Sequence, residues 1–193
     1  MLTPVTLTGE LVTLEPLHPD HHDDLVAAAS DGRLWELWYT SVPSPETMRA
    51  DIDRKLADPT TLPFTVRRND TGVVVGMTTY LNADPEVPRL EIGSTWTAAS
   101  AQRTGVNAES KLLLLTHAFE TLGCRVVEFR THWHNQQSRT AIARLGAKQD
   151  GVLRNHRRLP DGSMRDTVVF SILDTEWPAV RSGLLHRLAR AGA

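Results

Sequence analysis

The 193-residue sequence contains one cysteine, Cys124, so no disulfide can form within the chain. That scarcity is typical of a protein that works in a reducing cytoplasm. No apolar run comes near the roughly 20 residues that a membrane-spanning helix needs, and the first residues show neither the basic nor the apolar segment of a secretory signal. The sequence therefore predicts a cytoplasmic protein without a membrane segment.

An excess of charge of either sign is also missing. The 21 lysines and arginines nearly balance 23 aspartates and glutamates, for a net charge of -2, so nucleic acid is not expected as a partner. Neither G-x-x-x-x-G-K-[ST] nor G-x-G-x-x-G occurs, which leaves P-loop and dinucleotide-binding folds without motif support. Hydrophobic residues make up 40% of the chain, which at this length indicates one globular domain.

Strand and helix patterns alternate along this domain. Strand-like segments cover residues 10–17, 62–70, 73–82, 89–97 and 125–133, and a closing hairpin covers 151–173. Helical patterns cover 20–32, 44–59 (with Ser44 as cap), a segment ending at Gly123, 135–146 (with Asn135 as cap), and a tail over about 177–190. The order predicts a single mixed α/β domain over residues 1–193, with its core at about 10–174.

A polar loop, "QRTGVN", separates the strand at 89–97 from the helix that ends at Gly123. Helix N-termini carry unpaired backbone N–H groups that can bind an anion such as a pyrophosphate. Gly105 would let the main chain approach such a ligand closely, because glycine has no Cβ. Taken alone, the loop is equally compatible with a capped surface turn.

The context of this loop resembles the GCN5-related N-acetyltransferase (GNAT) family. "QRTGVN" is similar to the family's Q/R-x-x-G-x-G/A loop, and the later N-x-x-S…LGA…GVLR pattern is similar to the ribosomal-protein N-terminal acetyltransferase subgroup. The resemblance covers roughly residues 10–174. It implies the GNAT fold, in which a single mixed, mostly antiparallel sheet of about seven strands is splayed between strands four and five and flanked by helices.

In this family acetyl-CoA lies in the split of the sheet, with its pyrophosphate on the loop amides and its pantetheine arm along strand four. That strand supplies an N–H near the thioester oxygen, and an asparagine contacts the pantetheine from the other side. Asn107 stands where the family usually has Gly or Ala, so its side chain has to turn away, for example by capping the helix. The resemblance implies these cofactor-binding residues: Ser94, Thr95, Trp96, Gln102, Arg103, Thr104, Gly105, Val106, Asn107, Ala108, Asn135 and Ser138.

Acetyl transfer to an amine needs a base for the ammonium, stabilisation of the carbonyl oxygen and a proton donor for the thiolate. The usual tyrosine donor is replaced by Ile142, and the subgroup resemblance implies Ser138 as the acid. Glu91 is the candidate base, acting through water, and Glu128 and Glu109 are weaker candidates. The alternatives are a serine bonded to its own helix backbone and, for Glu91, a solvated charge at a strand end.

Aromatic and histidine residues are candidates for the acceptor side. Trp35, Trp38 and Tyr39 lie in a region that lines the acceptor site in this family, and the two tryptophans share a face if the segment is helical. Core packing is the other interpretation. His132 and His134 share a strand face near the cleft and are candidates for substrate binding or proton relay. No histidine spacing is that of a zinc site, so no metal is expected.

These patterns together predict an enzyme that moves an acetyl group from acetyl-CoA to a primary amine by direct attack in a ternary complex. The acceptor is either a protein N-terminus or a small-molecule amine, and a homodimer is common in the subgroup. Two other interpretations stay open. One is a non-catalytic acyl-CoA-binding or regulatory domain, favoured by Ile142 at the donor position. The other is a protein-interaction module that uses the sheet and the tryptophans as a binding surface.

Overall fold

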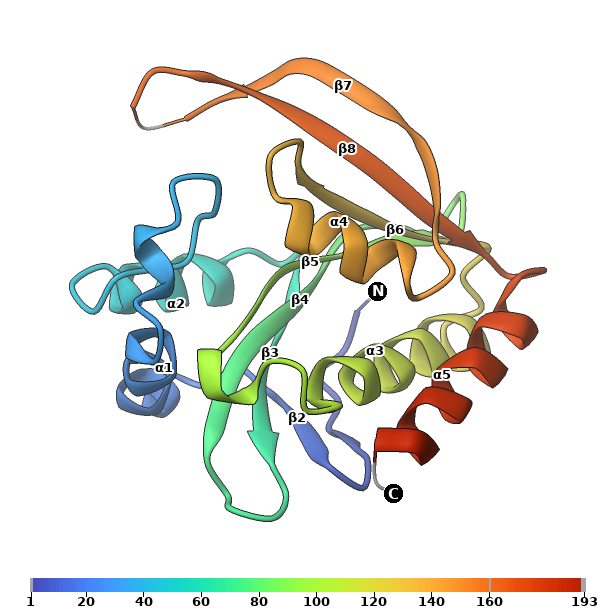
Figure 1. The fold of residues 1–193 in the computed structure, drawn as a ribbon, viewed down its shortest axis with the longest axis horizontal. Helices are drawn as coiled ribbons and strands as arrows, with labels where there is room; N and C mark the ends of the chain where they lie inside the picture. The colour runs from blue at the N-terminus through green and yellow to red at the C-terminus, as the bar shows by residue number, and fades with distance from the viewer. Residues whose placement is uncertain (1, 160, 192–193) are drawn as a thin grey trace.

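The computed structural model describes residues 2–159 and 161–191 and contains one sheet of eight strands (Figure 1). The strand order is β1-β2-β3-β4-β5-β6-β8-β7, and every neighbouring pair of described strands is antiparallel except β5 and β6. This confirms the predicted mixed sheet, and the two-residue β1 explains the additional strand. The strands are β1 (Leu7–Thr8), β2 (Val12–Pro16), β3 (Leu62–Arg68), β4 (Val74–Asp84), β5 (Arg89–Thr97), β6 (Val126–His132), β7 (Lys148–Arg158) and β8 (Met164–Leu173).

Helices flank the sheet: α1 (His22–Ser30), α2 (Met48–Ala57), α3 (Val106–Thr116), α4 (Gln136–Ala143) and α5 (Trp177–Ala191). A π-helical turn over His117–Thr121 extends α3. Phe119 in that turn stacks on Trp177 at the start of α5, while an added Cβ on Gly105, just before α3, would lie 3.8 Å from Leu188. The two helices therefore pack antiparallel. Across the described residues, no helix is both long enough and apolar enough to span a membrane.

The second long helix begins later than the sequence predicts. Ser44 was expected to cap it, but α2 starts at Met48 and Ser44 belongs to the preceding turn. In that turn the Thr47 hydroxyl accepts a hydrogen bond from the Ser44 N–H at 2.9 Å. The prediction was wrong because a Ser-Pro pair suits a turn as well as a helix start.

One face of the sheet is apolar and packs on α3. The Tyr80 hydroxyl donates to the Leu114 carbonyl of α3 at 2.6 Å, so Tyr80 faces this helix. Tyr80 lies opposite Ile92, and Leu90 lies opposite Val127. Since alternate residues of a strand share a face, these apolar side chains also point towards α3.

The residues between them point to the other side. Glu91 pairs with Glu128 across β5 and β6, and Arg130 and His132 follow at two-residue intervals. We call the surface formed by these four residues the polar face. Glu91, Glu128 and His132 are all less than 9% exposed, so this face carries buried polar groups that need partners.

β5 and β6 separate towards their C-terminal ends. Their parallel pairing joins Arg89–Glu91 to Val126–Glu128 and goes no further. β5 also has a bulge, in which Ser94 and Thr95 together oppose Thr78, and Ser94 adopts a left-handed φ of 46°. Because a bulge bends its strand, the end of β5 turns away from β6. This opening corresponds to the expected splay between strands four and five. These strands are β5 and β6 here, because the additional β1 raises each strand number by one.

Candidate functional site

The N-terminus of α3 presents free backbone N–H groups. Gly105 occupies the cap position without a side-chain hydrogen bond to the helix. The Glu109 N–H donates to the Gly105 carbonyl at 2.9 Å, whereas the N–H groups of Val106, Asn107 and Ala108 have no acceptor among the described residues. The Asn107 side chain does not cap the helix. Adjacent free N–H groups at the positive end of an α-helix suit a pyrophosphate.

The conformation and packing of the loop require a glycine at position 105. Its φ is 88°, a left-handed conformation that favours glycine. An added Cβ would lie 3.1 Å from Leu11 Cδ1 and 3.8 Å from Leu188 Cδ2. It would therefore meet protein side chains, so the turn and its packing require glycine here whether or not a ligand approaches.

Glu109, in the first turn of α3, holds the segment that precedes β2. Its Oε1 accepts from the Glu10 N–H at 2.9 Å, and its Oε2 accepts from the N–H groups of Leu11 and Val12, both at 2.7 Å. The side chain is buried, and an added Cβ on Gly9 would lie 2.5 Å from the Glu109 carboxyl carbon. Both carboxylate oxygens are engaged by main-chain donors, so Glu109 holds this segment in place and we do not assign it as the base.

The loop before α3 is tied to both sides of the opening. Gln102 Nε2 donates to the Thr97 carbonyl of β5 at 3.0 Å, and Gln102 Oε1 accepts from Gln137 of α4 at 3.0 Å. Arg103 adopts a left-handed φ of 65°, and the Thr104 hydroxyl donates to a carbonyl earlier in the loop at 2.6 Å. These contacts connect β5, the loop and α4, which brings the residues expected on the cofactor's two sides together.

A buried lysine supports the β5 bulge from the α3 side. Lys111 Nζ lies 3.0 Å from Thr95 Oγ1 and 3.3 Å from Thr78 Oγ1, and the two hydroxyls lie 2.8 Å apart. Lys111 is 5% exposed, and its burial lowers its pKa to about 7. Ser94 and Thr95 are exposed at the opening, whereas the Trp96 side chain is buried in the core. The cleft side of β5 is therefore formed by the bulge itself.

This lysine predicts a specific pH dependence of stability. Between about pH 7 and 10.5 the unfolded chain carries a proton on Lys111 that the folded chain lacks, so the free energy of unfolding rises with pH in this window. A Lys111→Met variant should lose this increase in the free energy of unfolding. When urea unfolding is measured at pH 7 and at pH 9, the increase between the two pH values should be smaller in the variant than in the wild type by up to about 2 kcal/mol.

Lys148→Met provides the control, because Lys148 is an exposed lysine whose pKa is raised by the hydrogen bond with Glu176. Its removal should leave the dependence between pH 7 and pH 9 unchanged. An equal dependence in Lys111→Met and the wild type would show that the Lys111 ammonium is not desolvated.

Glu91 is buried within an ionic network rather than solvated at a strand end. It is 7% exposed, and its Oε2 accepts from Asn82 Nδ2 at 2.9 Å and lies 3.5 Å from Arg130 Nε. Arg130 also donates to Glu128 at 3.0 Å, and Glu128 pairs with Arg89. The solvated alternative for Glu91 is therefore wrong, while Glu128 is held between two arginines.

The start of α4 places a free hydroxyl at the far side of the opening. Asn135 Oδ1 accepts from the Ser138 N–H at 2.9 Å, which confirms the predicted cap. The Ser138 hydroxyl makes no hydrogen bond with another described residue, so the alternative of a serine bonded to its own helix backbone is not observed. Ile142 is 9% exposed and belongs to the core.

His132 and Trp38 meet on the polar face. The His134 N–H donates to His132 Nδ1 at 3.0 Å, which places the proton of the neutral ring on Nε2. Burial lowers the pKa of His132, and the positive charges of Arg165 and His134 lower it further. Nε2 is buried without a partner among the residues that the structure describes. The Trp38 ring lies 5.3 Å from the His132 ring and 5.5 Å from the His134 ring.

The other residues expected on the acceptor side separate into two groups. Tyr39 lies edge-on to Trp38, with the ring centroids 5.6 Å apart. Trp35 packs instead against the hydrophobic core. A shared face for the two tryptophans required a helical segment, and this condition is not met, because the segment forms only a short 3-10 turn over Leu34–Glu36. Trp38 follows this turn and is 60% exposed.

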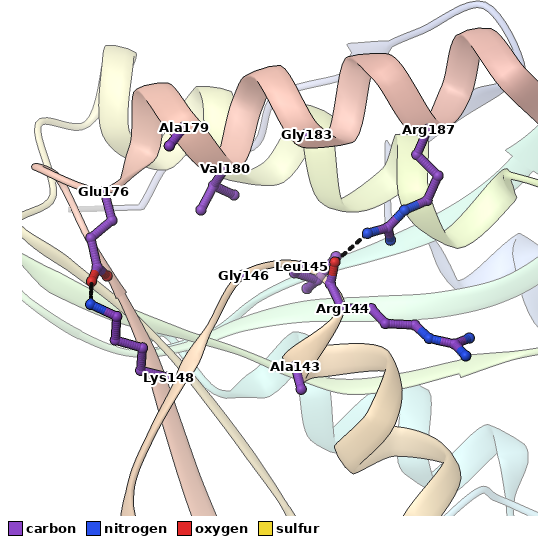
Figure 2. A pocket seen from close by; sticks show the side chains of 10 residues that line it. All are labelled: Ala143, Arg144, Leu145, Gly146, Lys148, Glu176, Ala179, Val180, Gly183 and Arg187. Atoms are coloured by element: carbon purple, nitrogen blue, oxygen red, sulfur yellow. Dashed lines mark hydrogen bonds and ion pairs between the residues drawn. The ribbon is translucent and has the colours of Figure 1, made fainter.

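A groove of about 470 Å³ lies elsewhere, between the end of α4, the start of β7 and α5 (Figure 2). An ion pair between Lys148 and Glu176 lies at one end, and Arg187 donates to the Arg144 carbonyl at the other. None of the predicted site residues lines this groove, so we do not assign the site there. Within the described ranges, no group of three or more His, Cys, Asp or Glu side chains is placed to hold a metal ion.

The sequence interpretation missed several residues of this site. Lys111 was hidden in the leucine run of α3, although a lone lysine ahead of four leucines is a signal of a buried charge. Arg130 was visible through alternation, because it lies between Glu128 and His132 on one face of β6. Asn82 had no such signal, since only the pairing of β4 with β5 brings it to Glu91.

Comparison with known proteins agrees with this geometry. The sequence matches the acetyltransferase (GNAT) domain over residues 12–148. A structure from T. thermophilus, assigned as an acetyltransferase, is 34% identical with a TM-score of 0.86, and the match covers 97% of this chain and 99% of that chain. A GCN5-related N-acetyltransferase from Brucella melitensis is 30% identical with a TM-score of 0.88, covering 97% and 86% of the two chains.

A more distant match carries information on the fold alone. The Salmonella typhimurium acetyltransferase that modifies the N-terminal serine of 50S ribosomal subunit protein L7/L12 is 16% identical, with a TM-score of 0.76 over 88% of this chain and 99% of that chain. No sequence among the curated proteins matches this chain.

Proposed function

The chain belongs to the GNAT acetyltransferase family, and from that premise we propose that it moves the acetyl group of acetyl-CoA to a primary amine by direct attack. The observation that carries this proposal is the set of free N–H groups at the start of α3, next to the opening between β5 and β6. This arrangement fits a pyrophosphate followed by a slender acyl arm, because the N–H donors lie next to the opening of the sheet.

We assign the binding roles as follows. The N–H groups of residues 106–108 bind the pyrophosphate, with the loop at 102–105 beside it. The segment of β5 at 94–96, which includes the bulge, aligns the pantetheine arm and provides main-chain N–H groups for the thioester oxygen. Asn135 and Ser138 lie on the α4 side. The contact between Gln102 and Gln137 supports this assignment, because it links the two sides.

Acetyl-CoA supplies the activated acetyl group, and side chains of the protein accept and donate the protons. The acceptor nitrogen forms a bond to the carbonyl carbon while the bond from that carbon to sulfur breaks. Glu91 receives the amine proton through water, and Arg130 and Asn82 keep its carboxylate in place. The unengaged Ser138 hydroxyl gives a proton to the thiolate, directly or through water.

Two measurements test this function. Calorimetry should show 1:1 binding of acetyl-CoA, and an assay of released thiol with a panel of amines should show turnover. Binding without turnover on any amine would favour the non-catalytic acyl-CoA-binding interpretation. Absence of binding would defeat both and favour an interaction module.

We expect Ser138→Ala to lower kcat about tenfold while the acetyl-CoA dissociation constant stays within about twofold, because water can replace part of the donor's role. Thr140→Ala, which removes an exposed hydroxyl from the same helix, is the control and should leave kcat unchanged. Equal turnover of Ser138→Ala and the wild type would remove Ser138 from the mechanism.

A further inference from the structure

We propose that the acetyl acceptor carries an anionic group, a carboxylate or a phosphate, which binds between Arg157 and Arg165 on the β7–β8 hairpin. This inference rests on the proposed amine-acetylating function and specifies the substrate class of the same site.

The register of the sheet places both arginines on an extension of the polar face. His132 of β6 lies opposite Thr167 of β8. Arg165 is two residues from Thr167 and therefore shares its face, and Arg157 of β7 lies opposite Arg165. Figure 1 shows the β7–β8 hairpin reaching past β6 towards the side of the molecule that carries α1 and α2. The arginines therefore lie beyond the end of β6, on the side where Trp38 covers His132.

Neither arginine is neutralised by the protein. Among the described residues, no carboxylate lies within 4.0 Å of Arg157 or Arg165, whereas the neighbouring carboxylates already have partners. Those of the polar face are held by Arg130, and Asp166 pairs with Arg154 at 2.6 Å. The hairpin therefore keeps two guanidinium groups available for an anion from outside.

Their arrangement is costly unless an anion joins them. Like charges directly opposite each other across a strand pair are destabilising. Arg165 is half-buried, and its Nε donates to Thr167 Oγ1 at 3.1 Å, which holds the guanidinium in place. Burial lowers the pKa of Arg165, and the charge of Arg157 lowers it further. A carboxylate or phosphate between the two would relieve this repulsion and match the forked donors of arginine.

The position also suits the reaction. The charge of Glu91, the proposed base, acts on Arg165 and opposes the lowering of its pKa, so the two lie within electrostatic reach. An acceptor could therefore place its anion on the arginines and its amine near Glu91. Protection of an edge strand by charge is the competing explanation. It accounts for the exposed Arg157 on the edge strand β7, but not for Arg165, which is half-buried and hydrogen-bonded to Thr167 instead of being held out in solvent.

The test compares acceptors that differ only in the anion. The pairs are phosphoethanolamine with ethanolamine, β-alanine with its amide, and tripeptide amides that begin with Asp or with Asn. We expect kcat/KM to favour the anionic member of at least one pair by about 10- to 100-fold, the range for a charged hydrogen-bonded contact. The pair with the largest ratio identifies the source of the anion. A preference for the neutral member in every pair would overturn the proposal.

The double variant Arg157→Gln/Arg165→Gln should reduce that ratio to about one through a higher KM for the acceptor, with an unchanged KM for acetyl-CoA. Arg158→Gln is the matched control, because Arg158 is an exposed arginine of the same strand, opposite Met164. It should keep the preference. A preference that survives in the double variant would also overturn the proposal.

An equilibrium measurement separates this inference from the proposed function. Calorimetric titration of the coenzyme A complex with phosphoethanolamine or β-alanine requires no turnover. We expect the wild type to bind at least one of them about 10-fold more tightly than the double variant does. If this difference appears without acetyl transfer to any amine, the proposed function fails and the anion site stands. Equal binding by both proteins would show that the arginines hold no anion.

Discussion

A Glu91→Gln variant should lose about 100- to 1,000-fold in kcat, the usual loss on removal of a general base. Gln is nearly isosteric with Glu and can still accept from Asn82, but it cannot take up the proton that leaves the amine. The acetyl-CoA dissociation constant should stay within about twofold, because Glu91 lies on the polar face and not at the N-terminus of α3. Steady-state kinetics with a saturating amine, together with calorimetry, measure the two effects separately.

Glu128→Gln is the appropriate control for this experiment. Glu128 is as buried as Glu91, pairs with the same Arg130, and lies directly opposite on β6. If Glu91 is the base, Glu128→Gln should lower kcat by less than about tenfold. A similar loss in both variants would attribute the effect to the arginine network and would remove Glu91 as the base.

The largest stability effect is expected for Glu109→Ala. The substitution removes the acceptor of three backbone N–H groups, those of Glu10, Leu11 and Val12, in a buried region beside α3. Hydrogen bonds to a charged group contribute about 1.5–3 kcal/mol each, and unsatisfied donors add a further penalty. Water will reach part of the site, so we expect a loss of about 3–5 kcal/mol in the free energy of unfolding, measured by urea denaturation.

Glu86→Gln serves as the control because Glu86 is an exposed carboxylate in the turn between β4 and β5. Its effect should stay within about 0.5 kcal/mol. Glu109→Gln should fall between the two, since one amide oxygen replaces two carboxylate acceptors. A loss below about 1 kcal/mol in Glu109→Ala would mean that β2 does not depend on this carboxylate.

Local pattern was sufficient for most elements of the fold. The strand at 89–97 matches β5, and the cap at Asn135 is observed with its hydrogen bond to the Ser138 N–H. These features were predictable because alternation and capping act over a few residues. The predicted start of α2 was misplaced. The hydrogen bond from the Ser44 N–H to the Thr47 hydroxyl stabilises a turn instead of a helix cap, and the sequence pattern does not reveal this bond.

The roles of individual charges depended on partners far along the chain. Glu109 could be assigned to the helix dipole from its position, yet its carboxylate is occupied by residues almost 100 positions earlier. Glu91 could equally be a solvated charge until β4 and β6 supply Asn82 and Arg130. The role of a buried polar group depends on which hydrogen-bond donors surround it, and these donors come from other strands.

By itself, the sequence determined the alternation of strands and helices, the polar loop ahead of α3 and the resemblance to an acetyltransferase family, because each is written in neighbouring residues. Only the tertiary structure decided which side chains share the polar face, that Lys111 lies beneath the β5 bulge, and that Arg157 and Arg165 stand opposite each other without a counterion among the described residues. Sheet pairing joins segments that are distant in the sequence, and a shift of one residue in register would turn every one of these side chains to the other face.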